Sequence, residues 1–218
     1  MKGAYSLRFS RSAQTYDRWA LPQRESARIL AEFVKPEGTV LDLGCGTGFV
    51  SSFLPSGCEP VGLDLSKEMV ALYRERFGRG IVGDAEELPF KDRSFDYVMS
   101  NFSLHWTDVK RSSHEALRVA RKGVGIALPV EGSLEVFNFP FPEEDFVLSL
   151  FRGYETSHFV REIEVPFRGW DLVCFFHYTG SSLNPRRRHL LTREKILNLI
   201  NSIEGAYFRM LFLYVRVV

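Results

Sequence analysis

The chain has 218 residues, a length that suits a single α/β domain. Hydrophobic residues make up 45% of it and charged residues 25%, close to the globular average, which excludes a largely disordered chain. The formal net charge is +1, so bulk charge gives no indication of a nucleic-acid partner. Any anionic partner would have to be bound by a local patch.

Cysteine usage and apolar segments indicate the cellular compartment. The three cysteines are odd in number and widely spaced, so they predict neither a disulfide framework nor a zinc site and fit a reducing cytoplasm. Residues 1–12 lack the apolar stretch of a signal peptide. The most apolar segment, residues 206–218, is too short to span a bilayer and contains two arginines, so we expect a buried strand there. We therefore predict a cytoplasmic protein without a membrane span.

Hydrophobic periodicity and turn residues predict alternating strands and helices. Strands are predicted at residues 39–43, 59–64, 80–84, 95–100, 123–128, 160–165 and 206–218. Helices are predicted at residues 9–34 with a break near Pro22, and at 49–54, 67–77, 113–120, 142–154, 170–178 and 193–203. This alternation indicates a parallel sheet with right-handed crossovers.

A glycine-rich turn follows the first predicted strand. Open α/β sheets bind ligands at the carboxyl ends of their strands, and this turn, residues 42–48, lies at such an end. Gly44, Gly46 and Gly48 let the backbone tighten and approach a ligand closely. The N–H groups at the start of the following helix favour a carboxylate. The turn therefore predicts a binding site for a nucleotide-like ligand.

Acidic residues end the next two predicted strands. Asp64 lies 20 positions beyond Gly44, where its carboxylate can accept hydrogen bonds from a ribose diol. Asp84 can accept from an exocyclic amine, and Ala85 offers a backbone N–H to a ring nitrogen. Dinucleotide-binding turns have the spacing G-x-G-x-x-G, which is not met here because Phe49 is the third residue after Gly46. The set predicts a pocket for an adenosine with a short zwitterionic tail.

These motifs together resemble the class I S-adenosylmethionine-dependent methyltransferases. The similar segments are residues 40–48 (motif I), 62–66 (second strand), 83–90 (adenine-binding motif) and 95–98 (fourth strand). The resemblance implies S-adenosyl-L-methionine as cofactor and a Rossmann-like α/β fold. That fold has a seven-stranded, mostly parallel sheet with an antiparallel last strand, helices on both faces and a small cap. The cofactor-binding residues that the resemblance implies are Tyr16, Asp42, Gly44, Cys45, Gly46, Gly48, Asp64, Leu65, Asp84, Ala85 and Asn101.

A narrower resemblance covers nearly the whole chain. Segments similar to the malonyl-acyl-carrier-protein O-methyltransferases of biotin synthesis are residues 9–17, 100–106, 131–134 and 190–193. The resemblance implies methylation of the free carboxylate of malonyl-acyl-carrier-protein, with the acyl carrier protein as partner. The sequence departs from this family at two places. The stretch between Ser133 and Leu190 is shorter than the family's cap, and residues 121–125 replace the commoner Pro-Gly-Gly turn. Alternatives are a C- or O-methyltransferase acting on a small-molecule acceptor such as a quinone precursor, and a non-catalytic S-adenosylmethionine-binding accessory protein.

We predict one domain with four parts. Residues 1–35 form an N-terminal helical lid, 36–133 the cofactor-binding core, 134–191 partly a cap, and 192–218 the final helix and strand. Tyr16 would belong to the lid over the methionine end of the cofactor, or else pack an amphipathic helix. Asn101 would line the cofactor pocket, or else form a turn.

The acceptor determines which catalytic groups are needed. A carboxylate is already ionised at neutral pH and needs no general base, so alignment and exclusion of water would supply catalysis. A carbon acceptor would favour a nearby base. His105 lies just past the fourth predicted strand and is the candidate catalytic residue, the alternative being a histidine packed beside Trp106. The five histidines show no metal-ligand spacing, so no metal is predicted.

A basic run near the C-terminus is the candidate substrate-binding segment. Arg186, Arg187 and Arg188 could bind the malonyl carboxylate bidentately or contact an acidic carrier protein, the alternative being a solvated loop. Residues that could extend this patch are Lys110, Arg111, Arg121 and Lys122. Nucleic acid is disfavoured as a partner because no basic groove with interleaved aromatic residues is present.

Overall fold

The computed structural model describes residues 2–137, 139–179, 203 and 205–217. The strands in this part are β1 (Thr39–Leu43), β2 (Glu59–Asp64), β3 (Gly80–Val82), β4 (Phe95–Asn101), β5 (Ala120–Pro129), β6 (Glu155–Glu164) and β7 (Tyr207–Arg216). They form one seven-stranded sheet in the order β3-β2-β1-β4-β5-β7-β6. Strands β1 to β5 pair in parallel, whereas β7 pairs antiparallel with both β5 and β6. The predicted Rossmann-like sheet with an antiparallel last strand is therefore confirmed.

Helix boundaries follow from capping residues. The described α-helices are α1 (Lys2–Trp19), α2 (Leu21–Val34), α3 (Phe49–Ser52), α4 (Lys67–Phe77), α5 (Val109–Val119), α6 (Glu144–Ser149) and α7 (Gly169–Tyr178), with short 3₁₀ helices η1 (Leu104–Trp106) and η2 (Glu135–Phe137). The predicted break near Pro22 falls at Ala20, and Pro22 occupies the first turn of α2, where its missing N–H costs nothing. Helix α4 has the predicted bounds because the Ser66 hydroxyl accepts the N–H of Met69.

Several predicted elements differ from the structure in their bounds, including the first helix, which begins at Lys2, β3, which ends at Val82, and β5, which begins at Ala120. Helix α5 starts earlier than residue 113 because the Asp108 carboxylate caps it by accepting the N–H groups of Lys110 and Arg111. Helices α3 and α6 are shorter than predicted. Strand β6 begins at Glu155 rather than at residue 160, because it is an edge strand with mostly exposed side chains and so lacks a hydrophobic pattern. The predicted helix at 193–203 lies outside the described residues, apart from Ile203.

Side chains alternate between two cores, one on each face of the sheet. Leu41 of β1 and Leu213 of β7 belong to the cluster that contains residues of α5 and α6. Val40 and Phe212, one position earlier in each strand, belong to the cluster that contains residues of α2 and α7. Strands buried on both faces are apolar at consecutive positions, which explains the continuous apolar runs in the sequence.

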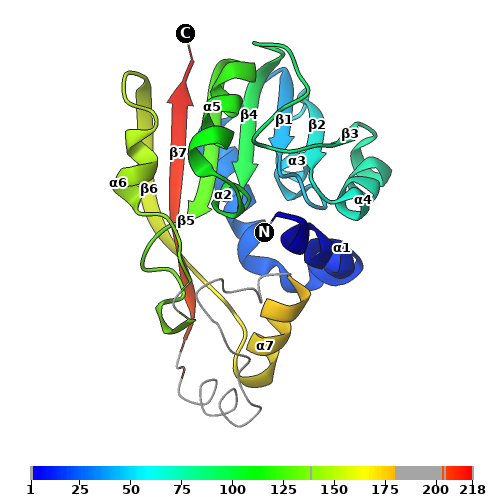
Figure 1. Ribbon diagram of the computed structural model, residues 1–218, viewed down its shortest axis with the longest axis vertical. Coiled ribbons are helices and arrows are strands. Elements are labelled where there is room, and N and C mark those ends of the chain that lie inside the picture. The colour runs from blue at the N-terminus through cyan, green and yellow to red at the C-terminus, as the bar shows by residue number, and fades with distance from the viewer. Residues whose placement is uncertain (1, 138, 180–202, 204, 218) are drawn as a thin grey trace.

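The carboxyl ends of the parallel strands share one edge of the sheet. Helix α1 lies across this edge, below β1 and β2, and α2 runs behind the sheet (Figure 1). Strand β1 pairs with β2 on one side and β4 on the other, so the order of the strands reverses there, and ligands of open α/β sheets bind at this point.

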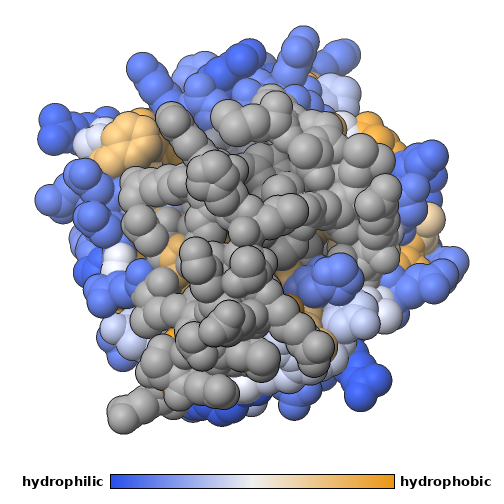
Figure 2. Space-filling view, turned by 60° about the horizontal axis from the view of Figure 1, so that its bottom comes forward, coloured by the Kyte–Doolittle hydropathy of each residue, from blue (hydrophilic) through white to orange (hydrophobic). Residues whose placement is uncertain are grey.

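The surface and the division into parts add two observations. On the face shown in Figure 2, the described residues at the rim are mainly hydrophilic, with only small apolar areas among them. None of the helices in the described ranges is long and apolar enough to cross a membrane.

Within the predicted cap segment, residues 155–164 belong to the same sheet as the core. The division of the domain at residues 35, 133 and 191 stays a prediction.

Candidate functional site

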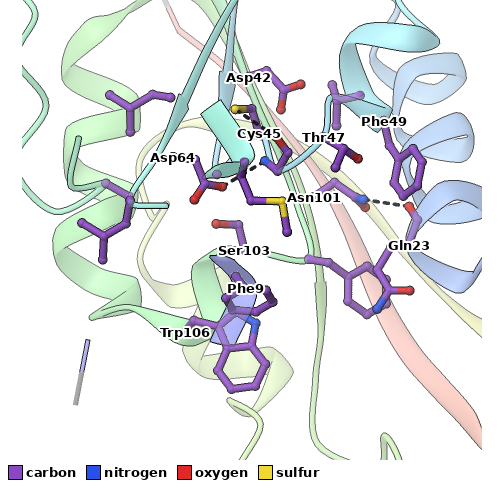
Figure 3. Close-up of a pocket in the computed structure, with 18 of the residues that line it drawn as sticks. Phe9, Gln23, Asp42, Cys45, Thr47, Phe49, Asp64, Asn101, Ser103 and Trp106 are labelled. Atoms are coloured by element: carbon purple, nitrogen blue, oxygen red, sulfur yellow. Dashed lines mark hydrogen bonds between the residues drawn. The ribbon is translucent and has the colours of Figure 1, made fainter. Parts of the chain in front are cut away.

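A cleft lies at the carboxyl ends of β1, β2 and β4. Figure 3 shows the labelled side chains around one space, with Asp64 on one side, Phe49 and Gln23 on the other, and Trp106 below. The predicted cofactor-binding residues that line the cleft are Tyr16, Asp42, Gly44, Cys45, Gly46, Asp64, Leu65, Asp84, Ala85 and Asn101. The fold thus brings together residues from the lid, the glycine turn and three strand ends.

The glycine turn is held in place mainly by its own backbone. The N–H groups of Gly44 and Cys45 both donate to the carbonyl oxygen of Leu63 in β2, at 2.7 and 3.0 Å. The N–H of Gly46 donates to Asp64 Oδ2 at 2.9 Å, and that of Gly48 to the oxygen of Cys45 at 2.8 Å. Helix α3, which follows, has only 4 residues. Hydrogen bonds within the protein therefore preorganise the turn. Because α3 is so short, its dipole attracts a ligand carboxylate less strongly than the sequence suggested.

The glycines of the turn have different structural roles. Gly46 has a φ of +50°, and a Cβ placed on it would meet nothing within 4 Å, so a ligand can approach its backbone closely. Gly48 does not line the cleft. Its φ is +96°, and a Cβ there would overlap the ring of Phe77. Gly46 therefore belongs to the wall of the cleft, whereas Gly48 allows α4 to pack against the turn.

Asp64 combines burial with bonds to two backbone N–H groups. Its Oδ2 accepts from Gly46, and its Oδ1 accepts from Ser66 at 2.8 Å. Burial raises the pKa of this carboxyl, and the N–H groups of Ser66 and Gly46 oppose the rise. A carboxylate offers about four acceptor positions. Asp64 therefore keeps capacity for hydrogen bonds from ligand hydroxyls, as a ribose diol requires.

Asp42 is the most buried acid of the cleft. Only 1% of it is exposed, and its Oδ2 accepts from both the N–H and the hydroxyl of Ser51, which also bonds to the Tyr73 hydroxyl at 2.6 Å. Burial raises the pKa of Asp42 to about 7, although the bonds from Ser51 lower it. These bonds tie the end of β1 to α3 and α4, so Asp42 fixes the turn that it precedes.

Asp84 and Ala85 follow β3 on a loop that is also fixed. Asp84 Oδ1 accepts the N–H of Glu86 at 2.9 Å, and Asp84 forms an isolated bridge with Glu87. Glu86 is buried and accepts the N–H of Asp108 at 2.8 Å. Asp84 therefore lies beyond the end of the strand, not inside it as predicted, but it still lines the cleft.

Helix α1 is bonded to the glycine turn by Asp17. The Thr47 hydroxyl donates to Asp17 Oδ1 at 2.6 Å, and Arg76 of α4 forms an ion pair with Asp17 Oδ2 at 2.6 Å. Tyr16, the neighbouring residue, lines the cleft, and burial is the main reason that the pKa of its hydroxyl lies well above the ordinary value. The hydroxyl of Tyr16 thus stays protonated. The bonds of Asp17 fix the position of α1 over the cleft.

Residues 41–128 match a family model described as a methyltransferase domain. A malonyl-[acyl-carrier protein] O-methyltransferase of Pectobacterium atrosepticum is 40% identical over 94% of this chain and 78% of its own length. A protein of the same name from Erwinia pyrifoliae is 37% identical, but the match covers only 62% of this chain and 54% of that relative.

The chain belongs to the S-adenosylmethionine-dependent methyltransferase family. Among solved structures, a methyltransferase of this kind from Thermotoga maritima has a TM-score of 0.62 and 20% identity, and the match covers 97% of this chain and 99% of that one. That likeness concerns the fold alone. The methyltransferase is thus an enzyme that uses S-adenosylmethionine, as the sequence motifs predicted.

Sequence reasoning missed several residues that line the methyltransferase's cleft. They are Phe9, Gln23, Thr47, Phe49, Val50, Leu63, Met69, Gly83, Phe102, Ser103, Trp106 and Thr107. Most are neighbours of predicted residues and could have been found by extending the motifs. Gln23 is different, because it comes from α2, far from any motif. Its backbone carbonyl accepts a hydrogen bond from Asn101 Nδ2 at 2.9 Å (Figure 3).

A second, smaller cavity adjoins the cleft of the methyltransferase. Its walls are mostly aromatic, and the residues that line it are Phe9, Tyr16, Gln23, Phe102, His105, Trp106, Leu134, Phe139, Phe141, Thr179 and Phe208. His105 lies here and not in the main cleft. Burial lowers its pKa to about 3, so it is uncharged at neutral pH, and its Nδ1 has no partner among the described residues. A catalytic role for His105 stays a prediction.

Only part of the predicted basic patch lies among the described residues. Arg186, Arg187 and Arg188 lie outside the described residues of the methyltransferase. Lys110 and Arg111 are exposed in the first turn of α5, which follows the carboxyl end of β4. Arg121 and Lys122 instead lie at the start of β5, at the opposite edge of the sheet, where they pair with Asp96. They therefore cannot extend a patch at the cleft.

Proposed function

We propose that this methyltransferase transfers a methyl group from S-adenosylmethionine to the free carboxylate of malonyl-acyl-carrier-protein, a step that would serve biotin precursor synthesis. The observation that carries the proposal is the 40% identity to a malonyl-[acyl-carrier protein] O-methyltransferase over 94% of the chain. A match of that extent includes more than the cofactor-binding motifs, which all members of the family share. The acyl carrier protein would be the partner, and free cysteines support a cytoplasmic location.

The cofactor would be held by the groups that line the main cleft. Asp64 would accept the ribose hydroxyls, because its carboxylate keeps acceptor capacity beside the bonds from Gly46 and Ser66. Asp84 would accept the exocyclic amine of the adenine, with Ala85 donating its N–H to a ring nitrogen. The open space at Gly46 would admit the backbone of the methionine part.

The reaction needs positioning more than proton transfer. When bound, the cofactor supplies an electrophilic methyl group on a positively charged sulfur. The chain would align the acceptor carboxylate with it and exclude water, which can contribute roughly 7–11 kcal/mol in favourable cases. No general base is required for an ionised acceptor. This agrees with the low pKa of His105, since a histidine that binds protons so weakly is a poor base at neutral pH.

A binding experiment tests whether the protein binds S-adenosylmethionine through Asp64, as every candidate function requires. Titration calorimetry with S-adenosylmethionine should detect binding to the wild-type protein and a loss of at least about tenfold in affinity for Asp64→Ala and Asp64→Asn. Asp145→Ala is the matched control, because Asp145 is exposed on α6. Equal affinity of wild type and both Asp64 variants would reject the assigned role of Asp64.

An acceptor experiment tests the substrate. Cofactor labelled in its methyl group is incubated with malonyl-acyl-carrier-protein, and acetyl-acyl-carrier-protein serves as the control that lacks a free carboxylate. The proposal expects label on the malonyl carrier and none on the acetyl carrier. Equal labelling of both carriers, or labelling of neither, would overturn it.

A second candidate function is methylation of a small aromatic acceptor such as a quinone precursor. The observation that favours it is the second cavity, where aromatic rings predominate and no described lining residue carries a charge at neutral pH. Aromatic walls can stack against an aromatic acceptor. Turnover of quinone precursors, with no turnover of malonyl thioesters, would establish this function in place of the first.

A further inference from the structure

Gln23 and Asn101 together form one part of the wall of the main cleft. Asn101 ends β4, Gln23 lies in the first turn of α2, and both residues line the cleft. Figure 3 shows them on the side of the cleft opposite Asp64. The cofactor groups assigned above to Asp64 and Asp84 leave this part of the wall without a ligand group.

Each of these two side chains contains a buried oxygen without a hydrogen-bond donor. The atoms are Gln23 Oε1 and Asn101 Oδ1, and neither has a partner among the residues that the structure describes. Only 4% of Gln23 is exposed, so bulk water is excluded from its side chain. Buried polar groups in proteins nearly always find partners, because an unpaired one costs free energy. Both oxygens therefore call for a bound molecule that donates hydrogen bonds.

The hydrogen bond between the two residues settles which atom of Asn101 is the unpaired one. A backbone carbonyl oxygen can only accept, so the atom of Asn101 that lies 2.9 Å from the Gln23 carbonyl oxygen is the donor Nδ2. This bond removes the usual ambiguity between the two ends of an asparagine amide. The unpaired end of Asn101 is therefore an acceptor. A ligand carboxylate, which also only accepts, cannot bind there.

The order of the strands places this pair of acceptors at the methionine end of the cofactor. The strands run β3-β2-β1-β4 across this part of the sheet. Asp84 follows β3, Asp64 ends β2, the glycine turn ends β1 and Asn101 ends β4. Neighbouring strands are about 4.8 Å apart, so the strand of Asn101 lies roughly 10 Å from that of Asp64. A cofactor with its adenine at Asp84 and its ribose at Asp64 therefore extends its methionine part across the glycine turn towards Asn101.

The cofactor has one donor group that is still unassigned. Its N–H and O–H donors are the adenine amine, the ribose hydroxyls and the α-ammonium group, and the first two are assigned to Asp84 and Asp64. An ammonium group has three N–H donors and no acceptor. The described residues that line the cleft include three acids, Asp42, Asp64 and Asp84, and no lysine, arginine or histidine. This distribution of charge favours a cationic group in the cleft.

We propose that Gln23 Oε1 and Asn101 Oδ1 accept hydrogen bonds from the α-ammonium group of S-adenosylmethionine. The inference deepens the proposed function, because it rests on the cofactor groups assigned there to Asp64 and Asp84, and it does not depend on the methyl acceptor. The ammonium has enough N–H groups to bind both oxygens. Methyl transfer leaves the methionine part unchanged apart from its sulfur, so S-adenosylhomocysteine, the demethylated product, is bound in the same way.

The test compares two ligands that differ only in the ammonium group. They are S-adenosylhomocysteine and its deamino analogue, in which hydrogen replaces the α-amino group. Titration calorimetry measures both dissociation constants, and their ratio isolates the ammonium from the rest of the ligand. For the wild type we expect the deamino analogue to bind at least about thirtyfold more weakly, because hydrogen bonds to a charged group are strong.

Variants at both positions give different expectations for this ratio. Gln23→Leu and Asn101→Leu each remove one acceptor, and each should lower the ratio by about tenfold. Gln23→Glu keeps an acceptor oxygen and can add a negative charge, so its ratio should equal or exceed that of the wild type.

Two further variants are controls. Asp64→Asn should weaken the binding of both ligands to the same extent and leave the ratio unchanged, because it acts on the ribose. Gln14→Leu makes the same chemical change as Gln23→Leu at an exposed position of α1, and its ratio should match that of the wild type. Binding of S-adenosylhomocysteine also reports that a variant is folded.

The outcomes separate this inference from the proposed function. If the wild type binds both ligands but either Gln23→Leu or Asn101→Leu keeps the wild-type ratio, the inference alone is overturned. It is also overturned if Gln23→Glu lowers the ratio as much as Gln23→Leu does. If the wild type does not bind S-adenosylhomocysteine, the cofactor assignment fails, and this inference fails with it. Failure to methylate malonyl-acyl-carrier-protein would instead overturn the proposed acceptor and leave this inference standing.

Discussion

The side-chain amide of Asn101 donates a hydrogen bond to the backbone carbonyl of Gln23, with 2.9 Å between Nδ2 and the oxygen. The bond joins the end of β4 to the first turn of α2, residues separated by 78 positions. The bond holds the start of α2 against the end of β4, at the place where Gln23 lines both the cleft and the second cavity.

Removing this bond should destabilise the fold. For Asn101→Ala we expect the free energy of unfolding to fall by about 1 kcal/mol, the usual net value of a hydrogen bond. Denaturant titration measures it. The control is Ser94→Ala, which removes an exposed bond from the Ser94 hydroxyl to the Lys91 carbonyl and should cost less. Equal stability of Asn101→Ala and wild type would show that the contact does not hold α2.

Two glycines with almost the same φ should respond differently to alanine. Gly48 has φ +96° and Gly57 has φ +94°, so both substitutions carry the left-handed strain of about 1–2 kcal/mol. At Gly48 the new Cβ would also overlap Phe77, whereas at Gly57 it meets nothing within 4 Å. Gly48→Ala should therefore be less stable than Gly57→Ala by a further ~1–3 kcal/mol in denaturant titrations. Equal losses would mean that Phe77 moves freely aside.

The bonds of Asp17 should affect how tightly the lid holds the cofactor. Asp17→Ala removes the bond from Thr47 and the ion pair with Arg76. We expect S-adenosylmethionine affinity to fall about fivefold, which corresponds to about 1 kcal/mol, with faster dissociation. Glu32→Ala is the matched control, because it breaks an equally short ion pair with Arg28 on the exposed side of α2. If both variants bind the cofactor as wild type does, α1 is not held by Asp17.

His105 should make the fold sensitive to acid. Its pKa is about 3 in the folded protein and about 6.5 when unfolded, so between these values only the unfolded chain binds the proton. The free energy of unfolding should therefore fall by about 1.4 kcal/mol for each pH unit below about 6.5. Asp42 acts in the opposite direction, because its folded pKa is raised to about 7.

The difference between wild type and His105→Gln isolates the histidine, since Asp42 is present in both proteins. Denaturant titrations at about pH 7 and about pH 5 should show the wild type losing more stability than the variant. Parallel losses in the two proteins would mean that His105 becomes protonated in the folded state.

The cofactor cleft could be predicted from sequence because its signals are local. Glycines that need positive φ, such as Gly46, and an acid at the end of a strand, such as Asp64, leave recognisable patterns within a few residues. Parallel topology then brings the strand ends together. Every predicted cofactor-binding residue except Gly48 lines the cleft.

The remaining features depend on contacts between distant segments. Gln23 looks like an ordinary helical residue, and it reaches the cleft because α2 packs against the end of β4, where Asn101 bonds to its carbonyl oxygen. The bond between Asp17 and Thr47 spans 30 positions, so no local pattern signals it. Strand β6 was predicted too short because an edge strand with exposed polar residues lacks hydrophobic alternation.

The most direct test of the account identifies the bond that the enzyme forms. The wild-type enzyme is incubated with malonyl-acyl-carrier-protein and cofactor carrying ¹³C in its methyl group, and the product is examined by carbon NMR before and after treatment with base. The account predicts an ester methyl signal that base releases as methanol. A methyl group attached to carbon, stable to base, or the absence of any labelled product would contradict it.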